Sequence, residues 1–285
     1  MELVPAWLAR HRFSYSPEQP DPALTDDLRT RLAQFRVDDP EVSIVVPAYN
    51  EEKKILNLLS SLAGQQTRYR TELIIANNNS RDQTQALLDA CGVRSVLVTQ
   101  QGIGFARQAG LEAAKGRYVV NADCDCMYPP GWLDALVKPL ANPAIVCTYG
   151  TYSFLPSAVN PRWALLLHET AASVVFAWRR WKGWECVNVM GFNFAFRRQD
   201  ALEVGGFNTN FKRGFTNDNN DEASEDGWMA MTLQAKGKLK RVTHNARVWS
   251  SDRLLVKDGG VLRAFSKRVQ KELRQLRLSL RPTSL

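Results

Sequence analysis

The sequence predicts an α/β fold built on a mostly parallel, Rossmann-like sheet that is flanked by helices. Between residues 41 and 140, short β-branched runs such as VSIVVPA, TELIIA and RYVVNA alternate with segments whose apolar residues recur at helical spacing. Polar or acidic residues follow each of these three runs, where the strand is expected to end. Strands that alternate with helices are typical of a parallel sheet covered on both faces.

The first 40 residues are expected to form an extension in front of this sheet. One helix is expected around Asp26–Phe35, and the prolines that punctuate the segment are Pro5, Pro17, Pro20, Pro22 and Pro40. Proline fixes φ and removes a backbone donor, so it favours turns and extended chain. No residue of this segment indicates chemistry.

The run of elements starts with the strand VSIVVPA. Asn50 is expected to cap the helix that follows, with Glu51 and Glu52 at the positive end of that helix. The next elements are a strand at TELIIA, a helix at QTQALLDA, a strand at SVLVT, a helix between Gly102 and Gly116 and a strand at RYVVNA. This order of β-α-β-α-β-α-β predicts parallel neighbours with helices on both faces.

The alternation weakens after about residue 140. Residues 141–252 are therefore interpreted as a second half of the molecule, in which tryptophan and basic residues gather between Trp163 and Trp184. Within the last segment, 253–285, apolar residues recur at helical spacing from Val261 to Leu280 among Arg and Lys residues, which predicts a basic amphipathic helix.

Composition limits the class of protein and its partners. The chain has 285 residues, 45% hydrophobic and 23% charged, and a net charge of +8, which suits anionic partners. Its five cysteines are an odd number, so free thiols in a reducing compartment are expected. We see no apolar signal core and no run of the roughly 18 apolar residues of a membrane span. A cytoplasmic protein is expected, either soluble or peripheral at the inner face of the membrane.

Two aspartates follow the strand RYVVNA, in the sequence NADCDC. Side chains at positions i and i+2 of an extended segment face the same way, so Asp123 and Asp125 are expected to present two carboxylates to one place. Open α/β sheets bind ligands at this end of their strands, and carboxylates there suit Mg²⁺ or Mn²⁺ holding a diphosphate. Cys124 and Cys126 are expected on the other side as small buried residues, because no second cysteine pair has zinc spacing.

Further polar patterns lie at the same sheet edge. PAYNEE follows the first strand, and NNNSRD follows the second. Arg107, in GIGFARQAG, is expected to reach a phosphate or a base. That segment lacks the third glycine of a dinucleotide-binding fingerprint, which excludes such a site. Taken singly, these patterns are also compatible with helix caps, polar turns and a surface arginine.

Two patterns in the second half indicate a helix start and close backbone contacts. In SEDGWMAMTLQAKG, Ser224 is expected to cap a helix with Glu225 and Asp226 in its first turn. In GFNFAFRRQDALEVGGFN, the glycines at 191, 205 and 206 indicate close backbone approach or a tight turn. Acidic residues at a helix start are, read alone, usual electrostatic tuning.

Together and in this order, the patterns resemble family 2 glycosyltransferases of the GT-A fold over roughly residues 41–252. The segments that carry the resemblance are VSIVVPAYNEE, ELIIANNNSRDQT, GIGFARQAGLEAAKGRYVVNADCD, GFNFAFRRQDALEVGGFN and SEDGWMAMTLQAKG. The resemblance implies a nucleotide-sugar-binding half over 41–140 and an acceptor-binding and catalytic half over 141–252.

The resemblance also implies roles for residues around the nucleotide. Pro47, Tyr49 and Glu51 match the first loop that contacts it, and Arg107 matches an arginine placed near it. Asn77 matches a position usually held by an aspartate that receives the imino hydrogen of the base. An asparagine oxygen can accept the same hydrogen bond. With asparagine in place of the usual aspartate, both uracil and guanine remain possible as the base of the donor.

The remaining roles concern the metal and the chemical step. Asp123 and Asp125 match the metal motif, with Asp125 as the more direct ligand of Mn²⁺ or Mg²⁺. Asp226 matches the catalytic base, and Glu225 is assigned to acceptor binding or support. His244 and the stretch VWSSDR fall where some members place a further metal or phosphate contact.

The implied activity is metal-dependent, inverting transfer of a single sugar from a nucleotide diphosphate, with a UDP-sugar favoured, to an acceptor hydroxyl. The metal would neutralise the leaving diphosphate, and Asp226 would take the proton of the hydroxyl. The acceptor stays open among saccharides, lipid-linked molecules and small molecules. The Gln-x-x-Arg-Trp signature of processive synthases is absent after residue 226, which favours transfer of one sugar.

Other functions remain as alternatives. A sugar nucleotidyltransferase usually has a glycine- and basic-rich loop after the first strand, where this chain reads PAYNEEKK. A catalytically degenerate binding or scaffold protein is disfavoured because Asp123, Asp125 and Asp226 are all present. No nucleic-acid partner is expected, since no recognisable module is present.

The C-terminal segment beyond about Val261 also leaves two interpretations open. With the Trp178–Trp184 patch, its apolar stripe and flanking Arg and Lys residues are expected to touch an anionic membrane surface. Alternatively, the stripe packs on the protein's own core or on a second subunit.

Overall fold

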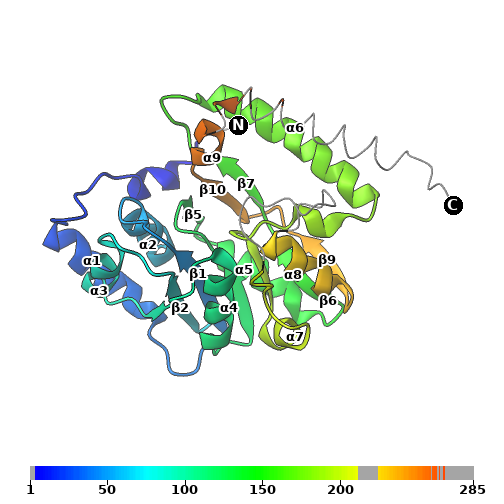
Figure 1. Ribbon diagram of the computed structural model, residues 1–285, viewed down its shortest axis with the longest axis horizontal. Coiled ribbons are helices and arrows are strands. Elements are labelled where there is room, and N and C mark those ends of the chain that lie inside the picture. Colours follow the sequence, from blue (N-terminus) through cyan, green and yellow to red (C-terminus); the bar gives the residue numbers. More distant parts are fainter. Residues whose placement is uncertain (1–3, 211–223, 258, 262, 264–265, 267–285) are drawn as a thin grey trace.

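The computed structural model describes residues 4–210, 224–257, 259–261, 263 and 266. Within them, a mainly parallel central sheet is covered by helices on both faces (Figure 1). The predicted α/β class is therefore confirmed. The helix predicted between Val261 and Leu280 lies almost wholly outside the described residues.

The central sheet has seven strands in the described part of the chain. They are β1 Val42–Ala48, β2 Thr71–Asn77, β3 Ser95–Leu97, β4 Tyr118–Asn121, β6 Ile145–Tyr149, β8 Phe194–Arg197 and β9 Lys238–Arg241. Their order is β3-β2-β1-β4-β8-β6-β9. β1 to β4 are parallel, as predicted, whereas β8 runs antiparallel to β4 and β6.

Helices cover this sheet on two faces, each with its own core. One face carries α1 Pro22–Leu32, α2 Ile55–Ala63, α3 Thr84–Ala90 and α5 Trp132–Val137. The other carries α4 Ile103–Ala113, α7 Arg198–Glu203 and α8 Glu225–Gln234. Strand side chains alternate between faces, so Ile44 and Val46 of β1 join the first core and Val45 joins the second.

A smaller sheet lies beside the central one. It consists of β5 Cys126–Met127, β7 Thr151–Phe154 and β10 Arg247–Ser250, in the order β5-β10-β7. The pairing of β5 with β10 brings the chain after Asp125 next to Ser251, whose N–H donates to the carbonyl of Asp125 at 2.9 Å. This sheet was not predicted, because its strands are too short to show a periodic pattern.

In the described part of the chain, the remaining elements are four short 3-10 helices and two helices away from the central sheet. The 3-10 helices are η1 Ala6–His11, η2 Ala33–Phe35, η3 Lys138–Ala141 and η4 Glu185–Asn188. α6 Arg162–Trp181 and α9 Arg253–Lys257 lie on the side of the smaller sheet, with α6 at the edge of the molecule (Figure 1). Among the described residues, no helix is both long and apolar enough to cross a membrane.

The N-terminal residues contribute to the main core. Leu28, Leu32 and Phe35 are buried with the side chains of α2 and α3. The helix there starts at Pro22, earlier than the predicted Asp26–Phe35. Asp21 caps it by accepting a hydrogen bond from the N–H of Ala23, and proline is favoured at the first helical position.

The prediction that Asn50 caps the helix after β1 was wrong. α2 begins only at Ile55, and Asn50 has a φ of 52°, a left-handed conformation that asparagine tolerates. Its side-chain oxygen accepts the N–H of Arg81 at 2.9 Å, and its own N–H donates to the hydroxyl of Ser80 at 3.0 Å. Asn50 therefore joins the loops after β1 and β2, and Glu51 lies outside the helix.

Candidate functional site

A cavity of about 510 Å³ opens at the carboxyl ends of β1, β2 and β4. This volume falls within the roughly 300–1,000 Å³ of ligand pockets. The loop after β1 contributes Pro47, Tyr49 and Glu51 to its wall, and the segment after β4 contributes Asp123. The cavity therefore lies at the edge where parallel α/β sheets bind ligands.

Hydrogen bonds between neighbouring loops hold this wall in place. The N–H of Glu51 donates to the hydroxyl of Thr84 at 2.9 Å, and that of Glu52 donates to Asp82 at 3.1 Å. The Glu52 carboxylate in turn accepts the N–H of Gln83 at 3.0 Å. The loop that carries Tyr49 and Glu51 is thus fixed by the loop after β2.

Asn78, and not Asn77, lies on the cavity wall. The Asn77 side chain accepts the N–H of Ser80 at 3.1 Å and donates to Gln85 at 2.8 Å. The Asn78 oxygen accepts the N–H of Gly102 at 2.7 Å, which holds the start of α4 beside the loop after β2. The pattern NNNS does not distinguish the two, because both side chains are short amides in a buried loop.

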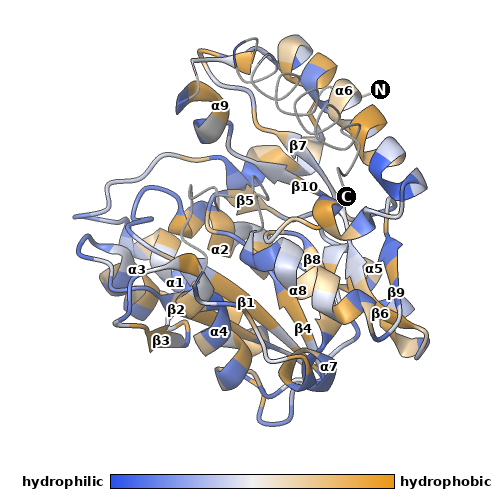
Figure 2. Ribbon diagram, turned by 45° about the vertical axis from the view of Figure 1, so that its right-hand side comes forward, coloured by the Kyte–Doolittle hydropathy of each residue, from blue (hydrophilic) through white to orange (hydrophobic). Residues whose placement is uncertain are grey.

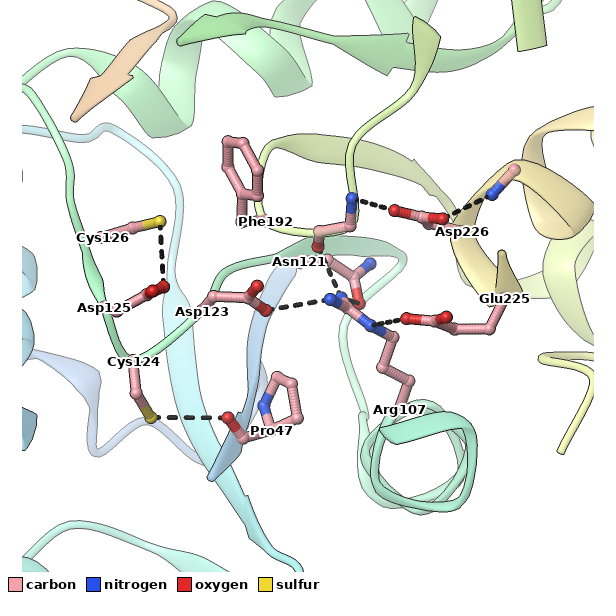
Figure 3. A network of polar contacts seen from close by, with 12 residues as sticks. Pro47, Arg107, Asn121, Asp123, Cys124, Asp125, Cys126, Phe192, Glu225 and Asp226 are labelled. Atoms are coloured by element: carbon pink, nitrogen blue, oxygen red, sulfur yellow. Dashed lines mark hydrogen bonds and ion pairs between the residues drawn. The ribbon is translucent and has the colours of Figure 1, made fainter. Parts of the chain in front are cut away.

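Arg107 is buried beneath the cavity, outside its wall, and connects the two halves of the site (Figure 3). Its guanidinium pairs with Asp123 at 2.9 Å and with Glu225 at 3.2 Å, and it also donates to the carbonyl of Gly191. Burial opposes the positive charge, but Asp123 and Glu225 outweigh it and raise the pKa of Arg107 above its ordinary value. Arg107 therefore orients acidic groups from β4 and α8.

Glu225 and Asp226 lie in the first turn of α8, which Ser224 caps as predicted. The Asp226 carboxylate accepts the N–H of Gly191 at 2.5 Å and that of Gly227 at 2.8 Å. Burial raises the pKa of Glu225, while its ion pair with Arg107 acts in the opposite direction. The two carboxylates are thus held differently, Glu225 by a buried cation and Asp226 by backbone donors.

Gly191 allows this contact because it has no side chain. A Cβ at this position would collide with the guanidinium of Arg107 and lie 2.9 Å from an oxygen of Asp226. The pattern GFNF predicted such a close approach. Gly205 and Gly206 have φ values of 92° and 73°, as expected of a tight turn.

Arg253, at the start of α9, is a cationic side chain on the cavity wall. It pairs with Asp125 at 2.8 Å and with Glu51 at 2.7 Å, and Asp125 also accepts the hydroxyl of Ser251 at 2.7 Å. Burial opposes the charge, but Asp125 and Glu51 raise the pKa of Arg253. The stretch VWSSDR contains this arginine, whose role as a partner of Asp125 we did not predict.

Asp123 and Asp125 therefore have separate partners. Cys124 and Asp125 form a turn, so the segment is not extended as expected. Cys124 and Cys126 are buried, as predicted, and burial raises the pKa of both thiols well above its ordinary value.

The donor set fits a divalent cation that is completed by a substrate. No group of three His, Cys, Asp or Glu side chains within the described ranges could hold a metal ion. His244 is exposed in the turn between β9 and β10 and lies outside the cavity wall. Asp123 and Asp125 supply carboxylate oxygens, however, and Mg²⁺ is usually held by one or two carboxylates together with substrate phosphates.

Comparison with known proteins identifies the family. The model of "Glycosyl transferase family 2" matches residues 43–205. Dolichol-phosphate mannosyltransferase of Saccharomyces cerevisiae is 35% identical over 120 residues, which cover 39% of this chain and 44% of that protein. An undecaprenyl-phosphate 4-deoxy-4-formamido-L-arabinose transferase of Pseudomonas fluorescens is 34% identical over 109 residues, or 35% of this chain and 32% of that protein. The chain thus matches less than half the length of these relatives.

Solved structures show that the fold is of the GT-A type. A mannosyltransferase of Pyrobaculum calidifontis, in complex with GDP-Man and Mn²⁺, has a TM-score of 0.56 at 18% identity, covering 87% of this chain and 76% of that one. TarS of S. aureus, in complex with UDP-GlcNAc, has a TM-score of 0.53 at 16% identity, covering 74% and 58%.

Proposed function

The chain belongs to glycosyl transferase family 2, and on this premise we propose that it moves one sugar from a nucleotide diphosphate to an acceptor hydroxyl with inversion at the anomeric carbon. One observation carries the proposal. Arg107 pairs both with Asp123, on the cavity wall, and with Glu225, which precedes Asp226 in α8. A donor site and a candidate base are thereby held together. This arrangement favours transfer over a scaffold role and over nucleotidyl transfer.

The nucleotide would occupy the cavity formed by the loop after β1, Asn78 and the start of α4. Tyr49, which is 47% exposed, offers an aromatic face to the base. Arg253 can donate to diphosphate oxygens, because a guanidinium forms charge-assisted hydrogen bonds with phosphate. A UDP-sugar is favoured and a GDP-sugar is the alternative, and both classes occur in the structures of similar fold.

Asp123 and Asp125 would hold Mn²⁺ or Mg²⁺ together with the diphosphate. The cation would supply charge neutralisation for the leaving group. Arg253 adds positive charge from the chain itself and keeps Asp125 oriented through their 2.8 Å ion pair. His244 has no part in this proposal because it is exposed outside the cavity wall.

Asp226 would act as general base on the acceptor hydroxyl. Two backbone N–H groups, those of Gly191 and Gly227, fix the direction of its carboxylate at the start of α8. Glu225 would support this geometry through Arg107. Displacement on the face opposite the leaving group inverts the anomeric carbon and requires no covalent intermediate.

A lipid-linked acceptor is favoured among the acceptors that the sequence leaves open. The names of the similar proteins from yeast and Pseudomonas refer to dolichol-phosphate and undecaprenyl-phosphate. The protein would then act at a membrane surface, with its proposed acceptor half facing the membrane.

Calorimetry with UDP and GDP, in Mn²⁺ and in EDTA, tests the donor site. We expect binding that is tighter with Mn²⁺ and an Asp125→Ala variant that loses this metal-dependent part while its fold persists. Asp39→Ala, on a side chain that is 91% exposed and away from the cavity, is the control. Equal affinity with and without the metal would contradict the metal role, and failure of both nucleotides to bind would contradict the donor class.

A further inference from the structure

The outward side of α6 and the turn that follows it carry a mainly apolar stripe. Seven exposed residues that recur at intervals of four and three form this α6 stripe, namely Trp163, Leu167, Thr170, Val174, Ala177, Trp181 and Trp184. The six from Trp163 to Trp181 lie within α6, where residues at this spacing share one face, and Trp184 follows the helix. Trp163 is 66% exposed, Val174 67% and Trp181 77%, so large apolar side chains face outward along the whole helix.

The opposite side of α6 anchors the helix without help from the stripe. Leu165, Ala172 and Phe176 are buried there. Glu169, also buried, forms two bonds with Arg162 at 2.7 and 2.8 Å and accepts the N–H of Phe154 in β7 at 2.8 Å. Glu169 is the only acidic residue of α6, so the outward side carries no negative charge.

We infer that the α6 stripe is a docking surface for an anionic lipid bilayer, on which α6 lies in the plane of the interface. Tryptophan, with its apolar ring and polar N–H, gathers at membrane interfaces, and here it occupies both ends of the stripe. Figure 2 shows hydrophobic residues along α6 at the edge of the molecule. A helix with one exposed apolar face and basic residues nearby can bind a membrane surface with its axis in the plane of the interface.

The charge distribution favours anionic lipid. Lys182 is exposed, with its ammonium group 4.8 Å from the ring of Trp181. Val261 packs with Leu165, near the start of α6. Residues 262–285, which follow Val261 in the sequence, contain seven Lys and Arg residues and one Glu. The whole chain has a net charge of +8. Basic residues near a membrane surface are attracted to anionic headgroups.

A second copy of the chain fits the stripe less well. The spacing of four and three also occurs in paired helices, whose contact positions are filled by Leu, Ile and Val that insert into holes of the partner. Three of the seven stripe positions hold tryptophan, including both ends. Rings of this size suit a headgroup region better than a close helix pair.

Docking by the α6 stripe would turn the acceptor half toward the membrane. α6 contacts η4, and η4 contacts α8, which carries Asp226. This step, unlike the docking itself, rests on the proposed function, and it assigns a lipid-linked molecule as the acceptor.

Flotation of the full chain with vesicles tests the docking surface. We expect binding to phosphatidylcholine vesicles that contain phosphatidylglycerol, and weaker binding to phosphatidylcholine alone. Replacing both Trp163 and Trp181 by Ser should lower the partition coefficient by at least about tenfold, because two exposed rings lose their apolar burial. Leu97→Ser, at a β3 position that is 65% exposed, is the matched control and should bind like the wild type.

Equal flotation of the double variant and the wild type would overturn the inference. So would a dimer, measured by sedimentation, that dissociates in the double variant while no vesicles bind. Calorimetry with UDP and GDP on the same variants separates docking from the proposed transfer. Unchanged nucleotide affinity together with lost flotation supports the inference, whereas unchanged flotation contradicts it even if the donor site is intact.

Discussion

The two halves of the site differ in how their residues are brought together. In the donor half, Pro47, Asn78 and Asp123 each lie at or just after the end of a parallel strand, so the sheet itself makes them neighbours. Other contacts of the site join distant segments. Arg107 meets Glu225 across 118 positions, and Arg253 meets Glu51 across 202. The pattern of strands in the sequence can therefore locate Pro47, Asn78 and Asp123. The positions of Arg107 and Arg253 depend on tertiary ion pairs, which the pattern does not show.

The two arginines show the same difference in their environments. Arg107 is buried and holds acidic groups beneath the cavity, while Arg253, whose side chain is 39% exposed, faces it. We expect the first to matter for stability and the second for donor binding. Substitutions of Arg107 and Arg253 test whether stability and donor binding depend on different arginines.

The largest effect is expected from Asp226→Asn. The amide keeps the shape but cannot take a proton, so turnover should fall by roughly 10²–10⁴-fold, as for loss of a general base. Sugar transfer measured at saturating donor gives the turnover. Glu225→Gln should lower it less, because Glu225 has a supporting role. Near-normal turnover of Asp226→Asn would contradict the assignment of the base.

Arg107→Met is expected to lower the free energy of unfolding by about 3–5 kcal/mol, the usual cost of breaking a buried ion pair. The reason is that Asp123 and Glu225 would be left close together without their cation. Urea denaturation measures the loss. Arg81→Met, at an exposed arginine, should stay within about 0.5 kcal/mol of the wild type. Equal stability of the two variants would show that Arg107 does not connect the halves.

Arg253→Ala is expected to weaken nucleotide diphosphate binding roughly 10–100-fold, the effect of losing hydrogen bonds from a charged group. Arg253→Lys should recover part of the affinity, because the charge remains while the paired donors are lost. Titration calorimetry with UDP and GDP measures both. Arg68→Ala, at a side chain that is 61% exposed and away from the cavity, serves as control. Unchanged affinity of Arg253→Ala would remove this arginine from the donor site.

The last effect depends on pH and is expected at His11, whose ring nitrogen lies 2.8 Å from the Ser60 hydroxyl of α2. Burial, with Arg10 and Arg31 nearby, lowers the pKa of His11 from 6.5 to about 4. Between these values the unfolded chain binds the proton and the folded chain does not. Stability should therefore fall as the pH drops from 6.5 to 4. The melting temperature of His11→Gln should change less between pH 6.5 and pH 4 than that of the wild type. Identical profiles for the two proteins would show that His11 does not contribute to the pH dependence of stability.

Local patterns predicted the parallel strands and four residues of the wall, Pro47, Tyr49, Glu51 and Asp123, because strand ends and polar loops are visible in short windows. They did not separate Asn77 from Asn78, since which side chain reaches the cavity depends on bonds to α4 and to Ser80. Asn50 was misassigned because a cap and a loop-to-loop contact use the same side chain.

Arg253 escaped prediction for a different reason. Its partners, Asp125 and Glu51, become neighbours only when β10 pairs with β5, and that pairing involves strands of four and two residues. The resemblance to family 2 glycosyltransferases directed attention to VWSSDR and to His244 together. Of these, the structure brings Arg253 to the cavity and leaves His244 exposed.

The separation of donor binding from proton transfer is tested most directly by one titration series. Calorimetry with the nucleotide that the wild type binds, in Mn²⁺, would be run on the wild type, Asp226→Asn and Arg253→Ala. We predict that Asp226→Asn keeps the wild-type dissociation constant and that Arg253→Ala loses affinity. If Asp226→Asn lost donor affinity while Arg253→Ala kept it, the halves would not divide binding and catalysis in this way.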